Sequence, residues 1–134
     1  YPALDPEFPA TSSSKIITGL LRQQMHYNGV VVTDDLEMGA VVRHATVAQT
    51  VINALNAGAD LMLVCHKIEL AIEARDACLH ALENGTLSSQ RVEEAVQRIN
   101  ALRQAHQSRQ ELAPPPVKER DYALLVEEIL RTST

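Results

Sequence analysis

The chain has 134 residues, a formal net charge of −5 and 46% hydrophobic residues. This is the composition of an ordinary soluble globular protein and, by length, of one small domain at most. The acidic balance argues against a nucleic-acid partner, because phosphate binding needs clustered Lys and Arg. No apolar run approaches the roughly 18 residues of a membrane span, so no membrane partner is expected. No signal peptide is visible, and the chain begins at Tyr1 rather than Met, which leaves room for sequence upstream.

The cysteines and histidines carry little chemical signal. Cys65 and Cys78 are too few for a disulfide framework, so we expect buried, reduced thiols. Cys65 is expected to be a core residue rather than a nucleophile, because no activating partner is evident. Reduced thiols and the lack of a visible signal favour a cytoplasmic location. No histidine stands at a metal-ligand spacing from a neighbour, so the sequence predicts no metal site.

Prolines mark both ends of the chain and leave the middle free for regular structure. Three of them lie within the first nine residues, and three more follow one another at 114–116. An amphipathic pattern over 122–129 then predicts a terminal helix that docks on the surface, or the start of a linker into another domain. We therefore divide the chain into residues 1–112 and a C-terminal segment, 113–134.

The first predicted elements are a helix and a strand. The serines at 12–14 can cap a helix at about 14–26, because a hydroxyl accepts from the free amides of a first turn. Gly29 ends that region, and Val30, Val31 and Val32 follow it. Consecutive β-branched residues are typical of a short strand covered on both faces, as in a parallel sheet. This strand is expected to run out at Thr33-Asp34-Asp35.

The remaining elements alternate. A helix over 46–57 is expected to close at Gly58, and a second apolar strand follows over 61–65. Helices are then predicted over 68–82 and about 89–106. Alternation of this kind indicates βα units and a parallel sheet. A parallel pair cannot bury both faces of two apolar strands by itself, so we infer further strands upstream.

Asp34 and Asp35 stand where the first predicted strand runs out. In parallel α/β folds the carboxyl ends of strands line the ligand crevice, so a carboxylate there can face a substrate. Either residue could instead cap a short helix over 36–42. Consecutive side chains at a strand end diverge, so the two need not share a role. His66 ends the second strand and can reach the same crevice, whereas Asp60 precedes that strand and is expected to be structural.

Several segments together resemble glycoside hydrolase family 3, over about residues 1–104. Leu20-Leu21-Arg22 followed by Gly29-Val30-Val31-Val32-Thr33-Asp34 is similar to its active-site signature. The continuation Asp35-Leu36-Glu37-Met38 resembles the β-N-acetylglucosaminidase (β-hexosaminidase) branch, although Glu37 departs from the small or polar residue usual there. The segments that resemble other parts of that barrel are Tyr1–Asp5, Pro9–Ser12, Ala57–Leu61, Arg91-Val92 and Arg98-Ile99.

The resemblance implies an α/β fold, namely the C-terminal portion of a (β/α)8 barrel with about strands 7 and 8 and their helices, plus a C-terminal helix. It makes Asp34 the nucleophile of a retaining exo-glycosidase that releases terminal β-linked N-acetylglucosamine through a covalent glycosyl-aspartate. Met38 would line the sugar site. No metal or organic cofactor is implied.

The same resemblance places the acid/base on a His-Asp loop earlier in the barrel, and no segment here matches that loop. Activity would then need the missing N-terminal part of the barrel, with the isolated 134 residues inactive. Cell-wall muropeptide fragments are one substrate class of such enzymes. The alternative from another class is a receiver-like signalling module, whose acidic pair binds a divalent cation. A receiver should show about five strands, so a strand count separates the two.

Overall fold

The computed structural model describes residues 1–38 and 45–110, together with Leu124 and Arg131. The chain divides into two compact units, Tyr1–Gln104 and Ala105–Thr134, and the following description concerns the first. The elements, in chain order, are η1 (Ala10–Ser12), η2 (Lys15–Gln24), β1 (Val32–Asp35), α2 (Val47–Ala57), β2 (Leu61–Leu63), α3 (Ile68–Glu83) and α4 (Ser89–Gln110). The predicted domain boundary at 112 and all of the predicted terminal helix but Leu124 lie outside the described residues. Within the described part of the chain, no helix is both long and apolar enough to cross a membrane.

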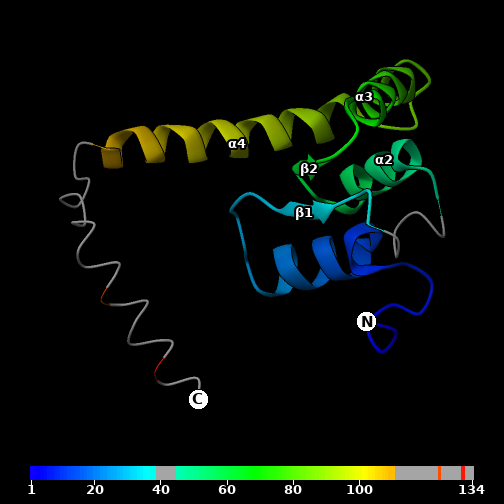
Figure 1. Cartoon of the computed structure of the whole chain (residues 1–134). Helices are drawn as coiled ribbons and strands as arrows, with labels where there is room; N and C mark the ends of the chain where they lie inside the picture. The colour runs from blue at the N-terminus through cyan, green and yellow to red at the C-terminus, as the bar shows by residue number, and fades with distance from the viewer. Residues whose placement is uncertain (39–44, 111–123, 125–130, 132–134) are drawn as a thin grey trace. The chain divides into compact units, whose positions relative to one another are not determined.

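β1 and β2 form a parallel pair, as the alternation of helices and strands predicts (Figure 1). Val32 lies opposite Leu61, and Asp35 lies opposite Leu63. The predicted end of this strand at Thr33-Asp34-Asp35 is confirmed, because β1 ends at Asp35, but the predicted start at Val30 is wrong, because β1 starts at Val32. The physical reason is the partner strand: the amide of Leu61 donates to the carbonyl of Val31, so the ladder starts there.

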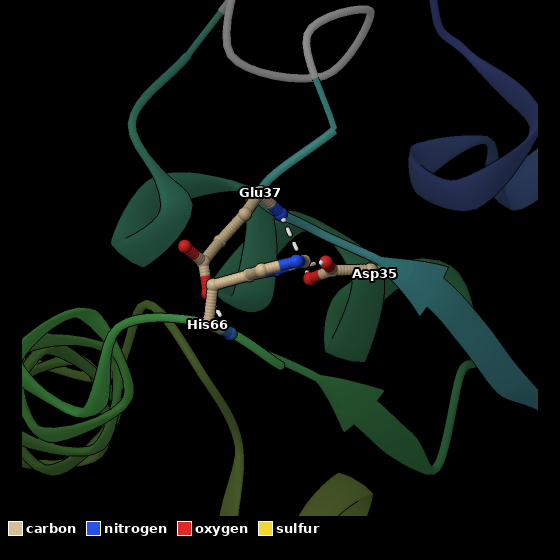
Figure 2. A group of neighbouring side chains, drawn as sticks. All are labelled: Asp35, Glu37 and His66. Atoms are coloured by element: carbon tan, nitrogen blue, oxygen red, sulfur yellow. Dashed lines mark hydrogen bonds and ion pairs between the residues drawn. The ribbon is translucent and has the colours of Figure 1, made fainter.

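β2 ends at Leu63, two residues before the predicted end of the strand. The amide of Leu36 donates to the carbonyl of Leu63 (2.9 Å), which is the last backbone bond between the two strand ends. Beyond it, side chains replace the ladder: Asp35 and Glu37 accept hydrogen bonds from the backbone that follows β2 (Figure 2). β2 is short because at this point the neighbouring segment of the chain presents carboxylate acceptors, rather than backbone groups that could continue the ladder.

Only one face of the sheet is covered by described residues. Thr33, on the covered face, is 8% exposed, whereas Val32 on the other face is 48% exposed. Leu61 and Leu63 lie exposed on the neighbouring strand. The predicted burial of both faces is therefore wrong for the described part of the chain, because its helices pack on one side of the sheet only.

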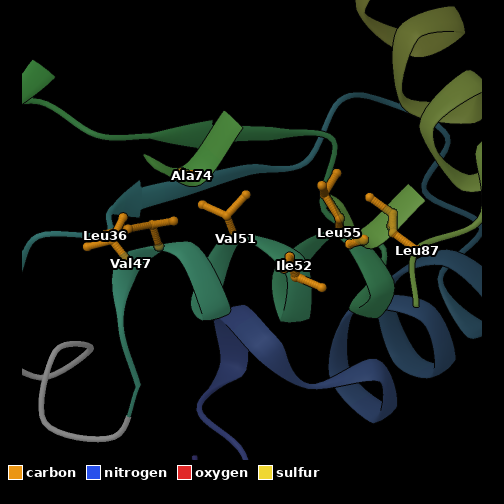
Figure 3. Close-up of a cluster of buried hydrophobic side chains, with 8 residues drawn as sticks. Leu36, Val47, Val51, Ile52, Leu55, Ala74 and Leu87 are labelled. Carbon is orange, nitrogen blue, oxygen red and sulfur yellow. The ribbon is translucent and has the colours of Figure 1, made fainter. Parts of the chain in front are cut away.

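α2 is the centre of the hydrophobic core (Figure 3). Its apolar residues contact α3 through Ala74 and Ala81 and the sheet through the partly buried Met62. On another side of α2, small residues allow η2 to pack closely through Ile17. The buried members of the main cluster are Leu36, Val47, Val51, Ile52, Leu55, Ala74, Ala81 and Leu87. The predicted helix over 46–57 is confirmed as the element on which the others pack.

The helix ends follow the predicted signals closely. The Ser13 hydroxyl accepts from the amide of Ile16 (3.1 Å) at the start of η2, and Thr46 accepts from Gln49 (3.2 Å) at the start of α2. η2 is wound as a π-helix, and the amide of Met25 donates to a carbonyl five residues earlier. α2 ends where predicted, at Gly58, whose φ of 115° lies in the left-handed region.

Replacing Gly58 with alanine should destabilise the fold more than the same change at Gly85. Both glycines have positive φ, which costs an L-residue about 1 kcal/mol. A Cβ at Gly58 would also lie 2.7 Å from Thr18 Oγ1 and 3.1 Å from Ile17 Cγ2, whereas a Cβ at Gly85 meets nothing within 4 Å. We expect Gly58→Ala to lower the free energy of unfolding by about 2–4 kcal/mol and Gly85→Ala by about 1 kcal/mol. Equal losses in urea unfolding would contradict the close approach of η2.

Candidate active site

Asp34 lies at the carboxyl end of β1, on the face of the sheet that is open to solvent. One carboxylate oxygen, Oδ1, accepts a hydrogen bond from the backbone amide of Asp35 at 2.8 Å. Oδ2 accepts none from the described part of the chain. The side chain is therefore held by one oxygen while the other stays available. This is the position and exposure that the sequence analysis expects of a residue facing a ligand.

Asp35 has a different environment from its neighbour. Its Oδ1 accepts from the amides of Glu37 (3.1 Å) and Cys65 (3.3 Å), and its Oδ2 lies 3.0 Å from Nδ1 of His66. The hydrogen bond from Glu37 is the largest influence on the carboxyl. Together with Cys65 and His66 it outweighs desolvation and lowers the pKa of Asp35 below its ordinary value. The expectation that the two aspartates diverge is thus confirmed.

Glu37 joins the ends of the two strands. Its Oε1 accepts from the backbone amide of His66 at 2.8 Å (Figure 2). The same oxygen accepts from the backbone amide of Lys67 at 3.0 Å. These two hydrogen bonds, that of Lys67 first, lower the pKa of the Glu37 carboxyl. Sequence reasoning missed this role. The only signal was the departure of Glu37 from the small or polar residue usual in the resembling family.

His66 reaches the end of β1, as predicted, and its side chain is 75% exposed beside Asp35. Met38, the other predicted substrate-binding residue, lies in the turn after β1 and is 51% exposed. Its amide donates to the carbonyl of Asp35 at 3.2 Å. The structure therefore brings Asp35, Glu37 and His66 together next to Asp34, with Met38 on the adjoining turn.

The same three side chains also form a set of possible metal ligands. One donor atom each from Asp35, Glu37 and His66 lies within 4.8 Å of the others. Two carboxylates and an imidazole suit a divalent transition metal. The sequence analysis found no such set because the residues come from two separate strand ends. Glu37 Oε1 and both oxygens of Asp35 have protein partners, so the three side chains also form a hydrogen-bond network with one another and with the backbone.

Cys65 is exposed, so the prediction of a buried core thiol is wrong at this position. Its residue follows β2 in the turn that Asp35 holds, rather than continuing the strand. Desolvation and then the charges of Asp35, Glu37 and Asp34 raise the pKa of the thiol. A raised pKa suppresses the thiolate, which agrees with the expectation that Cys65 is not a nucleophile. Cys78 is partly buried, and both thiols are free.

A buried carboxylate, in contrast to the exposed carboxylate of Asp34, lies at the start of β2. Asp60 has a fully buried side chain, which accepts from Arg22 (2.5 Å), Arg91 (2.6 Å) and Arg98 (3.0 Å). The amide of Val31 also donates to it, at 3.0 Å. Burial alone would raise the pKa of Asp60, but the Val31 amide and the arginines outweigh it and lower the pKa. The predicted structural role of Asp60 is confirmed.

The family model described as the glycosyl hydrolase family 3 N-terminal domain matches residues 1–102. The chain belongs to glycosyl hydrolase family 3. It is 35% identical over 102 residues to a β-hexosaminidase of Idiomarina loihiensis, covering 76% of this chain and 30% of that protein. The family predicted from the residues is thereby confirmed, and its relatives carry the name of the predicted branch. No comparison favours a receiver-like module.

Solved structures of the family superpose on this chain. A family 3 β-N-acetylglucosaminidase from Paenibacillus is 44% identical, with a TM-score of 0.75 over 87% of this chain and 22% of that one. The β-N-acetylglucosaminidase from Thermotoga maritima is 32% identical, with a TM-score of 0.70 over 75% of this chain and 22% of that one. These matches confirm an α/β fold of this family. The chain spans about 30% of the length of the first curated relatives it matches.

Replacing Asp60 with alanine should strongly destabilise the protein, because three partly buried guanidinium groups lose the carboxylate that they share, and only two of them keep Glu94 as a partner. We expect the free energy of unfolding to fall by about 3–5 kcal/mol. Asp76→Ala is the matched control, since Asp76 forms an exposed ion pair with Arg75 and should cost about 1 kcal/mol or less. Urea unfolding at neutral pH measures both. Similar losses in the two variants would contradict the structural role of Asp60.

The same carboxyl predicts a direction of pH dependence. Its folded-state pKa lies below the ordinary value of 3.8, so its contribution to stability is fully present well above that value. The contribution is lost as the pH falls from near 3.8 through the folded-state pKa. Asp5, Asp35 and Glu37 have lowered pKa values too and share this sign. Unfolding at stepwise pH should show a stability loss in acid that is smaller in Asp60→Ala but not abolished.

Proposed function

We propose that Asp34 is the catalytic nucleophile of a retaining exo-β-N-acetylhexosaminidase. The observation that carries the proposal is the placement of Asp34: an exposed carboxylate at the carboxyl end of β1, held by one oxygen with the other available. Membership of family 3 supports a glycosidase, and the names of the relatives support the sugar. Asp34 is also the residue that matches the nucleophile of the family signature in the sequence.

The proposed architecture makes β1 and β2 strands 7 and 8 of a (β/α)8 barrel. Val32, Leu61 and Leu63 would then face the barrel interior, which accounts for apolar side chains on an open face. The share of its relatives that the chain spans is consistent with the closing section of such a barrel. Residues 1–112 would belong to the barrel, and residues 113–134 would form the proline break and a terminal helix. The remaining strands and the acid/base would come from other residues of the protein.

In the proposed reaction the free oxygen of Asp34 attacks the anomeric carbon of the terminal sugar. A carbon–oxygen bond forms to Asp34, the glycosidic bond breaks, and the departing oxygen takes a proton from the acid. Water then attacks the glycosyl-aspartate and the stereochemistry is retained. Asp35 is unsuited to be the acid, because its oxygens are bound by Glu37, Cys65 and His66 and its pKa is lowered.

The proposed substrates are small and carry a terminal β-linked N-acetylglucosamine. Muropeptide fragments are one such class and would place the enzyme in cell-wall recycling in the cytoplasm. Residues 1–134 have only 4 aromatic residues, 3 Tyr and 1 Phe, so this part of the protein does not encode a long stacking groove for a polysaccharide. His66 and Met38 border the site and are proposed to contact the sugar. An exo-acting enzyme with a small pocket fits this composition.

Replacing Asp34 with alanine in the full-length protein should lower kcat on a chromogenic N-acetyl-β-glucosaminide by about 10³-fold or more, because the nucleophile is removed. Asp76→Ala, an exposed aspartate on α3, should leave kcat within about two-fold of the unchanged protein. Turnover that survives in Asp34→Ala at near-normal rates would rule out Asp34 as the nucleophile.

Two further measurements test the finer parts of the proposal. Proton NMR during hydrolysis should show the β-anomer of the sugar as the first product, and an α-anomer would contradict retention. Residues 1–134 expressed by themselves should be inactive on the chromogenic substrate, because the acid/base is proposed to lie elsewhere. Robust turnover by that fragment would overturn this part.

A further inference from the structure

One carboxylate holds the turn that carries His66. Backbone pairing between the strands ends at Leu63, and Glu37 Oε1 then accepts the amides of His66 at 2.8 Å and Lys67 at 3.0 Å. Two other interactions join this turn to the end of β1. They are the long bond from the Cys65 amide to Asp35 (3.3 Å) and the pair between Asp35 and the exposed His66 ring.

We propose that Glu37 is a positioning residue for sugar binding: it holds the turn of Cys65–Lys67 to the end of β1 and so fixes the His66 ring against Asp35, at the strand end that carries Asp34. This inference rests on the proposed function. It goes beyond it by giving a role to a residue that contacts no substrate in the proposed reaction.

The strengths of the three ties favour Glu37 as the main one. Hydrogen bonds from amides to an ionised carboxylate are roughly twice as strong as neutral ones, and Glu37 accepts two of them on one oxygen. The pair of Asp35 with His66 is weaker, because the His66 side chain is 75% exposed and water competes for it. Removing Glu37 would leave the turn held mainly by a single bond of 3.3 Å.

The hydrogen bonds of Glu37 also lie at the start of α3. Lys67 is the N-cap residue of α3, and its side chain makes no capping hydrogen bond. A carboxylate beside a helix N-terminus is favoured by the helix dipole. Glu37 therefore has a reason to stay ionised and in place, and its lowered pKa agrees with this geometry.

The functional consequence concerns the ring of His66. With Nδ1 3.0 Å from the Asp35 carboxylate, the neutral imidazole carries its proton on Nδ1, and Nε2 is left as an acceptor. An acceptor at a fixed place against Asp35, at the strand end that carries Asp34, suits a sugar hydroxyl. If the turn were free to move, the His66 ring would still be present but its position would vary. Substrate binding should therefore suffer more than the chemical step.

The test uses kinetics of the full-length protein with Glu37→Ala, Glu37→Gln, His66→Ala and the double variant Glu37→Ala/His66→Ala. Glu73→Gln is the control, because Glu73 is exposed on α3. We expect Glu37→Ala to raise KM about ten-fold with kcat within about three-fold, since two hydrogen bonds that place His66 are lost. Glu37→Gln should recover most of the KM, because an amide oxygen still accepts both amides. The double variant should be no worse than His66→Ala.

Hydrogen exchange supplies a readout that does not depend on turnover. The amides of residues 66 and 67 should exchange about ten-fold faster in Glu37→Ala and at nearly the original rate in Glu37→Gln. Unchanged exchange and KM in Glu37→Ala would overturn the proposal. So would a loss confined to kcat, or additive effects in the double variant. If Asp34→Ala stays active, the proposed nucleophile fails, while the exchange result still decides whether Glu37 holds the turn.

Discussion

The fold depends on one buried carboxylate. Asp60 is joined to Arg22 of η2 and to Arg91 and Arg98 of α4, and it also accepts the amide of Val31 just before β1. Two helices and the starts of both strands therefore meet at a single side chain. Charges removed from water are tolerated only when they are fully paired, so this arrangement fixes where those four segments can lie. The end of the sheet at which both strands begin is therefore held in place, and the strands extend from it toward their carboxyl ends.

The two ends of the sheet use the same kind of residue in opposite ways. At the start of the strands a carboxylate is buried and paired, and at their ends the carboxylates of Asp34, Asp35 and Glu37 are accessible to differing degrees. The neighbouring residues Asp34 and Asp35 show the same contrast. Both oxygens of Asp35 have protein partners, whereas Asp34 has a partner on one oxygen only. Asp60 and Asp35, whose oxygens all have protein partners, have a structural role. A carboxylate with an open oxygen at a strand end is available for chemistry.

The sequence allowed most elements to be predicted, because their signals are local. Thr46 and Gly58 mark the ends of α2 by cap chemistry that needs no knowledge of the rest of the chain. The strand bounds could not be found in this way, since they depend on which residues of β1 and β2 pair. The role of Glu37 and the exposure of Cys65 were missed for the same reason: both follow from a contact between residues about 30 positions apart. Asp34 could be proposed as a site residue from the sequence because the family signature is contiguous.

The uncovered face of the two strands has a consequence for how residues 1–134 behave in solution. Val32, Leu61 and Leu63 are apolar and exposed, and both strands have an outer edge that pairs with no described strand. Unpaired edges with apolar side chains recruit further strands, from another copy of the chain if no other is at hand. Further strands of the same polypeptide, paired with these edges, would protect them better than any change of buffer. The open face of the sheet that carries Asp34 is thus also the face through which copies of residues 1–134 would associate.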